Sequence, residues 1–331
     1  MTHVAVLGAG SWGTTVAALL SGKVPTLLWA RDPAVADEVE RSSTNRSYLG
    51  PYRLPEGLHA TASIADALAG AMLVVLAVPA QGLRGVLEGA NAARARPPAG
   101  SPVLSLVKGM EVDTLLRPSE IVERCWPGLR LAVLTGPNLA AEILEGQPSA
   151  SVVASRDATL ALELQELLST ATLRIYTNPD VVGCEVAGVV KNVMAIATGM
   201  AAGLGLGDNT RAALVTRALA ELTRLGVRLG GATATFAGLA GVGDLVATCT
   251  SRRSRNFSLG FALGQGRRLD EVLASTRTVA EGVTSCRPVV ALAHRNGVDA
   301  PVAEQVVAVC YEGMAPREAI PRLMSRAPRA E

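Results

Sequence analysis

The stretch HVAVLGAGSWG, residues 3–13, decides the fold. After His3, residues 4–7 form an apolar run typical of a buried strand, and G-x-G-x-x-G then opens a helical pattern that extends to about Leu20. The first glycine permits a tight turn, the second lets the backbone approach a pyrophosphate, and the third allows the helix to pack closely on the sheet. Free amides at the helix start attract the anion. We therefore expect a dinucleotide to be bound by Gly8, Gly10, Ser11, Trp12 and Gly13.

Short runs rich in Val and Leu continue through the first half of the chain and alternate with helical patterns. The predicted strands are 3–7, 26–30, 72–78, 102–107, 131–135, 151–154 and 173–176. Because βα crossovers are right-handed and place helices on both faces, this order predicts a doubly wound, mostly parallel, Rossmann-like α/β sheet. Ligands of such sheets bind at the C-terminal ends of the strands.

Strand patterns end at the turn-forming cluster Asn178-Pro179-Asp180, and helical periodicity takes over. The helical patterns cover 182–203, 210–225, 235–240, 257–264, 269–275, 287–296 and 301–312. Since 331 residues exceed what one hydrophobic core usually supports, two domains are expected. We predict a dinucleotide-binding domain at residues 1–178 and an all-helical substrate and catalytic domain at residues 179–331.

Composition and charge exclude several classes of function. The 31 basic and 29 acidic residues give a net charge of +2 without runs of like charge, so we expect a small-molecule partner and no nucleic acid. The five cysteines have neither metal-ligand nor disulfide-framework spacing, which indicates no metal site and a reducing compartment. The first predicted strand leaves no room for a signal peptide. The apolar stretch 186–206 contains Lys191, which favours a buried helix over an integral membrane span. A cytoplasmic protein is expected.

The end of the second predicted strand bears on the choice of cofactor. Arg31 and Asp32 stand about twenty residues after the glycine motif, where dinucleotide-binding folds distinguish a ribose hydroxyl from a 2′-phosphate. The planar guanidinium of Arg31 suits a phosphate, whereas Asp32 could accept hydrogen bonds from ribose hydroxyls. Alternatively, Asp32 caps a helix that begins at Pro33 and both residues belong to a surface loop. The pattern favours NADPH and leaves NADH open.

Two lysines are candidates for the chemistry. Lys108 follows the strand predicted to end at Val107, at the sheet edge where α/β folds bind ligands, although a solvated loop lysine is the alternative. Lys191 lies in an apolar helical pattern whose neighbouring positions supply no carboxylate, so its ammonium needs a distant partner unless it extends to water. Burial lowers the pKa of a lysine and a nearby carboxylate raises it, which makes such a group a tunable proton donor.

A third cluster combines Gly241-Val242-Gly243-Asp244 with the arginine, serine and asparagine side chains of residues 251–256. Guanidinium groups, a hydroxyl, an amide and the free amides of a helix start together match the oxygens of a phosphate. The cluster therefore indicates an anion site. A basic, capped helix start at the surface is the alternative interpretation.

Six motifs in matching order resemble those of bacterial-type NAD(P)-dependent glycerol-3-phosphate dehydrogenases across nearly the whole chain. They are GAGSWGT at 8–14, SLVKGME at 105–111, GPNLAAE at 136–142, KN at 191–192, the segment from GDL at 243–245 to SRN at 254–256, and VAEG at 279–282. Any one is weak, but six in register are highly specific. Leu139 in place of a phenylalanine and Arg211 in place of a common lysine depart from the pattern without touching residues expected to do chemistry.

The resemblance implies reversible reduction of dihydroxyacetone phosphate to sn-glycerol 3-phosphate with NADPH or NADH, feeding glycerophospholipid synthesis. It implies that Lys191 donates the proton, with Lys108 and Asp244 as catalytic partners. The residues implied to bind substrate are Lys108, Gly136, Asn138, Lys191, Asp244, Ser254, Arg255 and Asn256. Besides the glycine loop and Arg31, those implied to bind the cofactor are Lys108, Ala140, Arg255, Val279 and Glu281.

Two further functions fit parts of the pattern. A two-domain reductase of a 3-hydroxy acid, a ketopantoate-like acid or a 6-phosphogluconate-like sugar acid would share the sheet and a lysine-bearing helix, but the segment 244–256 argues against it. A non-catalytic dinucleotide-sensing protein would keep the glycine loop without needing Lys191, Lys108 and Asp244 together. A homodimer is expected from the large apolar helical half.

Overall fold

The computed structural model describes residues 2–275 and 280–325. The chain folds into two compact units: one comprises the residues up to Glu111 with Leu116–Glu185, and the other Val112–Leu115 with the residues from Val186 on. The last passage from one unit to the other lies inside a continuous helix, α9 (Val181–Gly203). The domain boundary near Asn178 that the sequence suggests stays a prediction.

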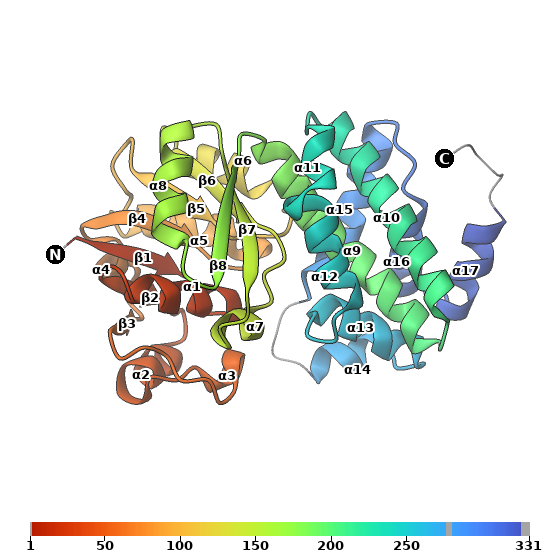
Figure 1. Cartoon of the computed structure of the whole chain (residues 1–331), viewed down its shortest axis with the longest axis horizontal. Helices are drawn as coiled ribbons and strands as arrows, with labels where there is room; N and C mark the ends of the chain where they lie inside the picture. Colours follow the sequence, from red (N-terminus) through yellow and green to blue (C-terminus); the bar gives the residue numbers. More distant parts are fainter. Residues whose placement is uncertain (1, 276–279, 326–331) are drawn as a thin grey trace. The chain divides into compact units, whose positions relative to one another are not determined.

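An eight-stranded sheet forms the centre of the first unit (Figure 1). Its order is β3-β2-β1-β4-β5-β6-β7-β8, and every neighbouring pair is parallel except β6 and β7, which confirms the predicted Rossmann-like, mostly parallel sheet. The strands are β1 (His3–Leu7), β2 (Thr26–Trp29), β3 (Leu58–Thr61), β4 (Ala71–Leu76), β5 (Pro102–Ser105), β6 (Arg130–Thr135), β7 (Ser149–Ser155) and β8 (Leu173–Asn178). The edge strand β3 is missing from the prediction because only Leu58 of its four residues is buried, so no apolar run marks it.

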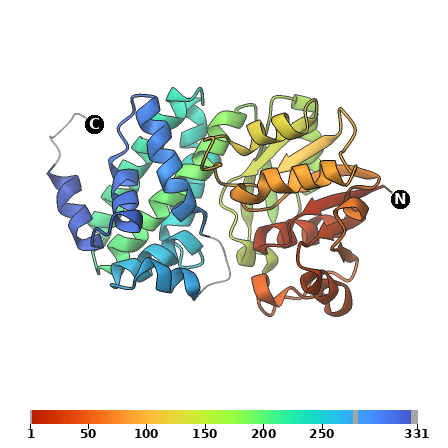
Figure 2. The same cartoon turned by 180° about the vertical axis from the view of Figure 1, so that it is seen from behind.

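Helices cover both faces of this sheet because successive strand residues point to opposite sides. Val4 and Val6 of β1 enter a core cluster with α1 and α8, whereas Ala5 and Leu7 enter a second cluster with α5 and α6. Figure 2 shows α5 in orange over the face that is turned away in Figure 1. The helices of this unit are α1 (Ser11–Ser21), α2 (Pro33–Ser42), α3 (Arg46–Leu49), α4 (Ile64–Leu68), α5 (Ala80–Ala92), α6 (Pro118–Cys125), α7 (Ala140–Leu144) and α8 (Ala158–Leu168).

The second unit is helical in its described residues, as predicted, and α9 is its central helix. α9 is long and apolar enough to span a membrane, but 94% of its most apolar window is buried inside the protein, so it is a core helix here. The other elements are α10 (Asp208–Arg228), α11 (Thr233–Ala237), η1 (Leu239–Gly243), α12 (Asp244–Thr250), α13 (Arg255–Gly264), α14 (Leu269–Ala274), α15 (Glu281–Arg295), α16 (Pro301–Tyr311) and α17 (Pro316–Met324). The sequence predicts neither α12 nor α17.

Four glycines bring the backbones of α9 and α13 into direct contact. A Cβ atom on Gly199 would lie 2.2 Å from the carbonyl oxygen of Phe257, and one on Gly260 would lie 2.1 Å from that of Ile196. Gly203 and Gly264 repeat the arrangement one turn further along. Because no side chain fits between the helices, the start of α13 is held against the helix that carries Lys191.

Candidate functional site

The glycine loop after β1 has the geometry that a bound pyrophosphate requires. Gly8 has φ +122°, and a Cβ on it would lie 2.6 Å from the carbonyl oxygen of Ala77. A Cβ on Gly13 would lie 2.0 Å from the carbonyl oxygen of Gly8, so helix and strand touch at this point. At Gly10, by contrast, no atom of the described chain lies within 4 Å of a Cβ, which leaves the backbone open to a ligand. The loop therefore fits a dinucleotide.

The start of α1 also has backbone amides that could bind an anion. Gly10 is the N-cap of α1, and no side chain of the described residues caps the helix there. The buried indole Nε1 of Trp12 also has no hydrogen-bond partner within the described part of the chain. Uncapped amides at a helix start bind phosphate oxygens.

Two residues before and within α3 hold the glycine loop in place. Asn45, which is fully buried, donates from Nδ2 to the carbonyl oxygen of Ala9 at 2.9 Å and to Oγ1 of Thr14 at 2.9 Å. Ser11 Oγ donates to the carbonyl oxygen of Tyr48 at 2.7 Å. The sequence pattern misses Asn45 because its partners lie more than thirty positions away.

At the end of β2, Asp32 is a helix cap. Its Oδ1 accepts a hydrogen bond from the backbone amide of Ala34 at 3.0 Å, and Pro33 occupies the first position of α2. This is the capping role that the sequence left open for Asp32. Arg31 is exposed beside it, and its role with a 2′-phosphate stays a prediction.

Lys108 lies in a loop that is fixed at its far end. Arg84 of α5 binds Glu111 through two hydrogen bonds, of 2.9 Å from Nε and 2.8 Å from Nη2, and Gln81 Nε2 donates to the carbonyl oxygen of Met110 at 2.6 Å. Lys108 Nζ itself donates to the carbonyl oxygen of Gly136 at 2.9 Å. The structure thus brings together Lys108 and the loop after β6, two of the predicted site segments.

The loop after β6 contributes a donor that the described part of the chain does not satisfy. Asn138 accepts a hydrogen bond on Oδ1 from Ser151 Oγ, while its buried Nδ2 has no hydrogen-bond partner among the described residues. Gly136 has φ +119°, and a Cβ on it would approach the Cα of Ser151 to 3.1 Å. Ala140 begins α7. A buried donor without a partner calls for a ligand or water oxygen, so Lys108 and Asn138 suit polar groups of a substrate.

In the second unit, the ammonium of Lys191 lies against a carboxylate and a hydroxyl. Lys191 Nζ is 2.5 Å from Asp244 Oδ1 and 2.9 Å from Thr248 Oγ1, and Lys191 and Asp244 are 6% and 1% exposed. Asp244 opens α12 and Thr248 follows one turn later on the same side, where its hydroxyl also donates to the Asp244 carbonyl oxygen at 2.6 Å. The resemblance names Asp244 as a catalytic partner, whereas Thr248 has no predicted role, although the i, i+4 spacing of these two residues is visible in the sequence.

A buried thiol completes the surroundings of this pair. Burial raises the pKa of Cys249 to about 12, an effect that Lys191 opposes and Asp244 reinforces. The thiol therefore stays protonated at neutral pH.

The segment 254–256 starts α13. Ser254 is the N-cap and accepts a hydrogen bond on Oγ from the amide of Phe257 at 3.3 Å. Asn256 is buried; its Nδ2 donates to Asn192 Oδ1 at 3.0 Å, and its Oδ1 accepts from the amide of Gly282 at 2.9 Å. Asn192 is a further residue of the cluster that the sequence assigned no role. Asn256 therefore ties α9, α13 and α15 together, besides any contact with substrate.

Arg255 at the start of α13 and Glu281 at the start of α15 have opposite charges and attract each other. Part of the Arg255 side chain reaches solvent, but desolvation lowers the pKa of its guanidinium and Glu281 opposes that shift. Val279, which the sequence also assigns to the cofactor, lies outside the described residues. The roles of Arg255, Glu281 and Val279 stay predictions.

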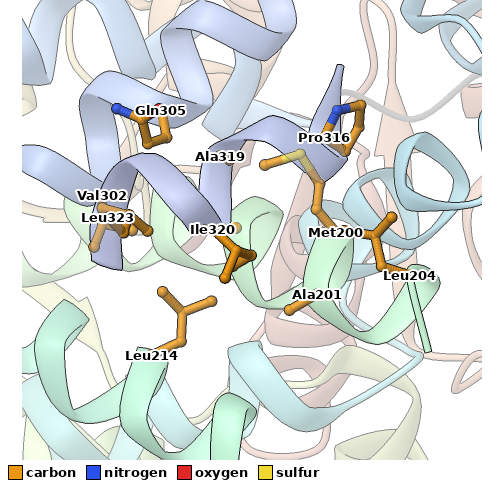
Figure 3. Close-up of a pocket in the computed structure, with 11 residues that line it drawn as sticks. Met200, Ala201, Leu204, Leu214, Val302, Gln305, Pro316, Ala319, Ile320 and Leu323 are labelled. Atoms are coloured by element: carbon orange, nitrogen blue, oxygen red, sulfur yellow. The ribbon is translucent and has the colours of Figure 1, made fainter. Parts of the chain in front are cut away.

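An apolar cavity in the second unit lies away from these groups. Figure 3 shows it between α9, α10, α16 and α17, lined by Ala197, Met200, Ala201, Leu204, Leu214, Val302, Gln305, Pro316, Ala319, Ile320 and Leu323. None of the candidate site residues lines it. Among the residues that the structure describes, no group of His, Cys, Asp and Glu side chains could hold a metal ion.

Known proteins match the chain over its whole length. The family model described as the N-terminus of NAD-dependent glycerol-3-phosphate dehydrogenase matches residues 3–161, and the one for its C-terminus matches residues 180–321. The chain is 50% identical to glycerol-3-phosphate dehydrogenase (NAD(P)+) 2 of Sphingopyxis alaskensis, over 92% of this chain and 90% of that protein. It is 49% identical to the glycerol-3-phosphate dehydrogenase (NAD(P)+) of Thermobifida fusca, over 100% of this chain and 99% of that one. The crystal structure of glycerol-3-phosphate dehydrogenase from Coxiella burnetii superposes with a TM-score of 0.92 at 35% identity and covers 98% of each chain.

Proposed function

Because the chain belongs to the NAD-dependent glycerol-3-phosphate dehydrogenase family and is an NAD(P)-dependent oxidoreductase, we propose that it reduces dihydroxyacetone phosphate reversibly to sn-glycerol 3-phosphate with Lys191 as proton donor. The observation that carries the proposal is the buried contact of Lys191 with Asp244 and Thr248. A buried ammonium requires a partner of this kind to stay charged, and a charged ammonium is the form that can give up a proton.

Lys191 acts on the oxygen of the substrate carbonyl. When bound, the nicotinamide supplies the hydride to the carbonyl carbon, and Lys191 gives its proton to the alkoxide that develops on the oxygen. General-acid assistance of this type contributes roughly 10² to 10⁴ in rate. Asp244 and Thr248 hold the ammonium in position throughout and accept its remaining hydrogens. The reaction itself requires hydride and proton to reach the same carbonyl group.

The first unit supplies binding groups for cofactor and substrate. We assign the pyrophosphate to the amides at Gly10, Ser11 and Trp12, since that helix start carries no side-chain cap within the described residues. Lys108 and the unsatisfied Nδ2 of Asn138 suit oxygens of the substrate. Ser254, Arg255 and Asn256 would contact substrate from the start of α13, with Glu281 and Val279 on the cofactor.

Substitution of Lys191 tests the proposal directly. Lys191→Met should lower kcat for dihydroxyacetone phosphate at least ~10²-fold, because it removes the proton donor but keeps an unbranched side chain. The Kd of NADPH, measured by titration calorimetry, should change by no more than a few-fold. The matched control is Lys23→Met: Lys23 Nζ donates to carbonyl oxygens at the end of α8, including that of Leu167 at 2.9 Å, outside the proposed site. A parallel loss of kcat and NADPH binding in Lys191→Met would show that the lysine is structural.

A screen of substrates separates this proposal from its rivals. Turnover of a 3-hydroxy acid, a ketopantoate-like acid or a 6-phosphogluconate-like sugar acid, with none of dihydroxyacetone phosphate, would favour the related reductases. NADPH binding without turnover of any substrate would favour a dinucleotide sensor. We further propose that the glycerol 3-phosphate supplies phospholipid synthesis and that the protein is cytoplasmic. We also propose that it is a homodimer, which light scattering of the purified protein tests.

A further inference from the structure

Glu185 is a buried carboxylate on α9 that the proposed reaction does not use. Its side chain is 0% exposed. In the sequence, Glu185 precedes Lys191 by six residues. Oε2 is 2.6 Å from Arg117 Nη1 and 2.5 Å from Ser119 Oγ, while Oε1 accepts from the backbone amide of Ser119 at 2.7 Å. Arg117 is the N-cap residue of α6 and Ser119 lies in the first turn of that helix. The Glu185 carboxylate on α9 therefore binds groups at the start of α6.

The partners of Glu185 fix its position in space. Arg117 is in turn held by Glu120 at 3.0 Å, and burial raises the pKa of Glu185 while Arg117 and Ser119 lower it. Buried ion pairs are weak evidence for stability, because desolvation offsets most of the attraction. Their directional hydrogen bonds nevertheless define one geometry for the Glu185 carboxylate at the start of α6, and such specificity is their best-attested use.

Glu185 and Lys191 are joined by a continuous helical segment, so the position of one restricts the position of the other. α9 runs without a break through both residues, and every residue from 184 to 201 is buried. Six residues of helix span about 9 Å, so the Lys191 amine is carried on a short rigid segment that begins at the anchored carboxylate. A misplacement of about 1 Å at a reacting group can cost ~10² in rate.

We propose that Glu185 is a positioning residue for Lys191: its hydrogen bonds to Arg117 and Ser119 fix the first turns of α9, the continuous helix that carries the proton donor. The inference rests on the proposed role of Lys191. It assigns to Glu185 no contact with substrate or cofactor.

A double-mutant comparison separates positioning from a merely structural role. We compare kcat of wild type, Glu185→Gln, Lys191→Met and the double variant at saturating substrate and NADPH, with the enzyme concentration raised so that slow turnover is measurable. Glu185→Gln should lower kcat ~10- to 100-fold in the wild-type background. In the Lys191→Met background it should lower the residual rate about twofold or less, because the group that it positions is already absent. The Kd of NADPH should stay within about twofold of wild type.

Two further variants keep the test decisive if Glu185→Gln folds poorly. Ser119→Ala removes one hydroxyl bond and leaves the ion pair, and it should lower kcat several-fold in the wild-type background only. Asp157→Asn is the matched control, because Asp157 also joins an arginine, Arg130 at 2.7 Å, to a helix start, that of α8. This control should keep wild-type kcat.

Equal fold-losses from Glu185→Gln, or from Ser119→Ala, in both backgrounds would overturn the inference, as would unchanged kcat in both variants. If Lys191→Met alone retained wild-type activity, the proposed function would fail instead. The two failures are therefore distinguishable.

Discussion

Gly260→Ala tests whether the contact of α9 and α13 holds the site together. A Cβ on Gly260 would lie 2.1 Å from the carbonyl oxygen of Ile196, whereas ordinary contacts of a Cβ begin at 3.4 Å. The difference requires the helix backbones to separate by roughly 1.3 Å, because the obstacle is backbone and cannot rotate away.

One turn before Gly260 stands Asn256, whose Nδ2 is 3.0 Å from Asn192 Oδ1. A separation of that size takes this pair beyond hydrogen-bonding distance and moves Ser254 and Arg255 with it. Overpacking of this kind costs about 1–3 kcal/mol of the free energy of unfolding. Displacement of binding groups by about 1 Å should lower kcat/KM for dihydroxyacetone phosphate by up to ~10².

The assay compares urea denaturation, followed by far-ultraviolet circular dichroism, with steady-state kinetics. Gly85→Ala is the matched control, because Gly85 lies inside α5 and no atom of the described chain is within 4 Å of a Cβ there. Alanine at such a helix position should stabilise by up to about 1 kcal/mol and leave activity unchanged. If Gly260→Ala were as harmless as Gly85→Ala, the close packing of α9 and α13 would not have the role assigned to it.

Three further predictions follow from other contacts. Gly13→Ala should weaken NADPH binding roughly 5- to 150-fold by calorimetry, because a Cβ would lie 2.0 Å from Gly8 O; unchanged affinity would contradict the assigned cradle. Arg31→Ala should raise the KM of NADPH more than that of NADH, and parallel changes would remove the 2′-phosphate role. Burial raises the pKa of Glu221 to about 7 from 4.5, so the folded state binds its proton more tightly than the unfolded chain and the free energy of unfolding should fall by about 3 kcal/mol between pH 4.5 and 7. Urea titrations should show this decline in wild type and its loss in Glu221→Gln; identical profiles would contradict it.

The sequence predicts the sheet well because its signal is local. Buried parallel strands are unbroken apolar runs, as in β4 and in β1 from Val4 on, and the glycine motif marks the first turn between strand and helix. Strand ends and helical patterns indicated Lys108 and Lys191 as candidates, and the resemblance to one family added their roles. The structure places Lys191 beside Asp244 and Lys108 beside Gly136. Their roles rest on the experiments above.

What the sequence could not show is long-range geometry. The bonds of Asn45 to the glycine loop and of Glu185 to Ser119 join residues more than thirty and sixty positions apart, and no periodicity links them. Helix α12 was missed because Gly241 and Gly243 resemble a loop. In the structure Gly241 allows tight packing against the backbone of Phe236, and η1 continues directly into the helix. A glycine close to a helix can thus indicate either a loop or a close contact between backbones, and only tertiary contacts distinguish the two.

The position of Trp12 in the nucleotide loop has a spectroscopic consequence. The three tryptophans of the chain, Trp12, Trp29 and Trp126, all belong to the first unit, and Trp29 and Trp126 are buried there. Intrinsic emission of indole therefore reports on the first unit, which also contains the proposed nucleotide contact of Trp12, and not on melting of the helices around Lys191. Emission and ellipticity recorded on one sample would resolve the unfolding of the two units without any introduced label.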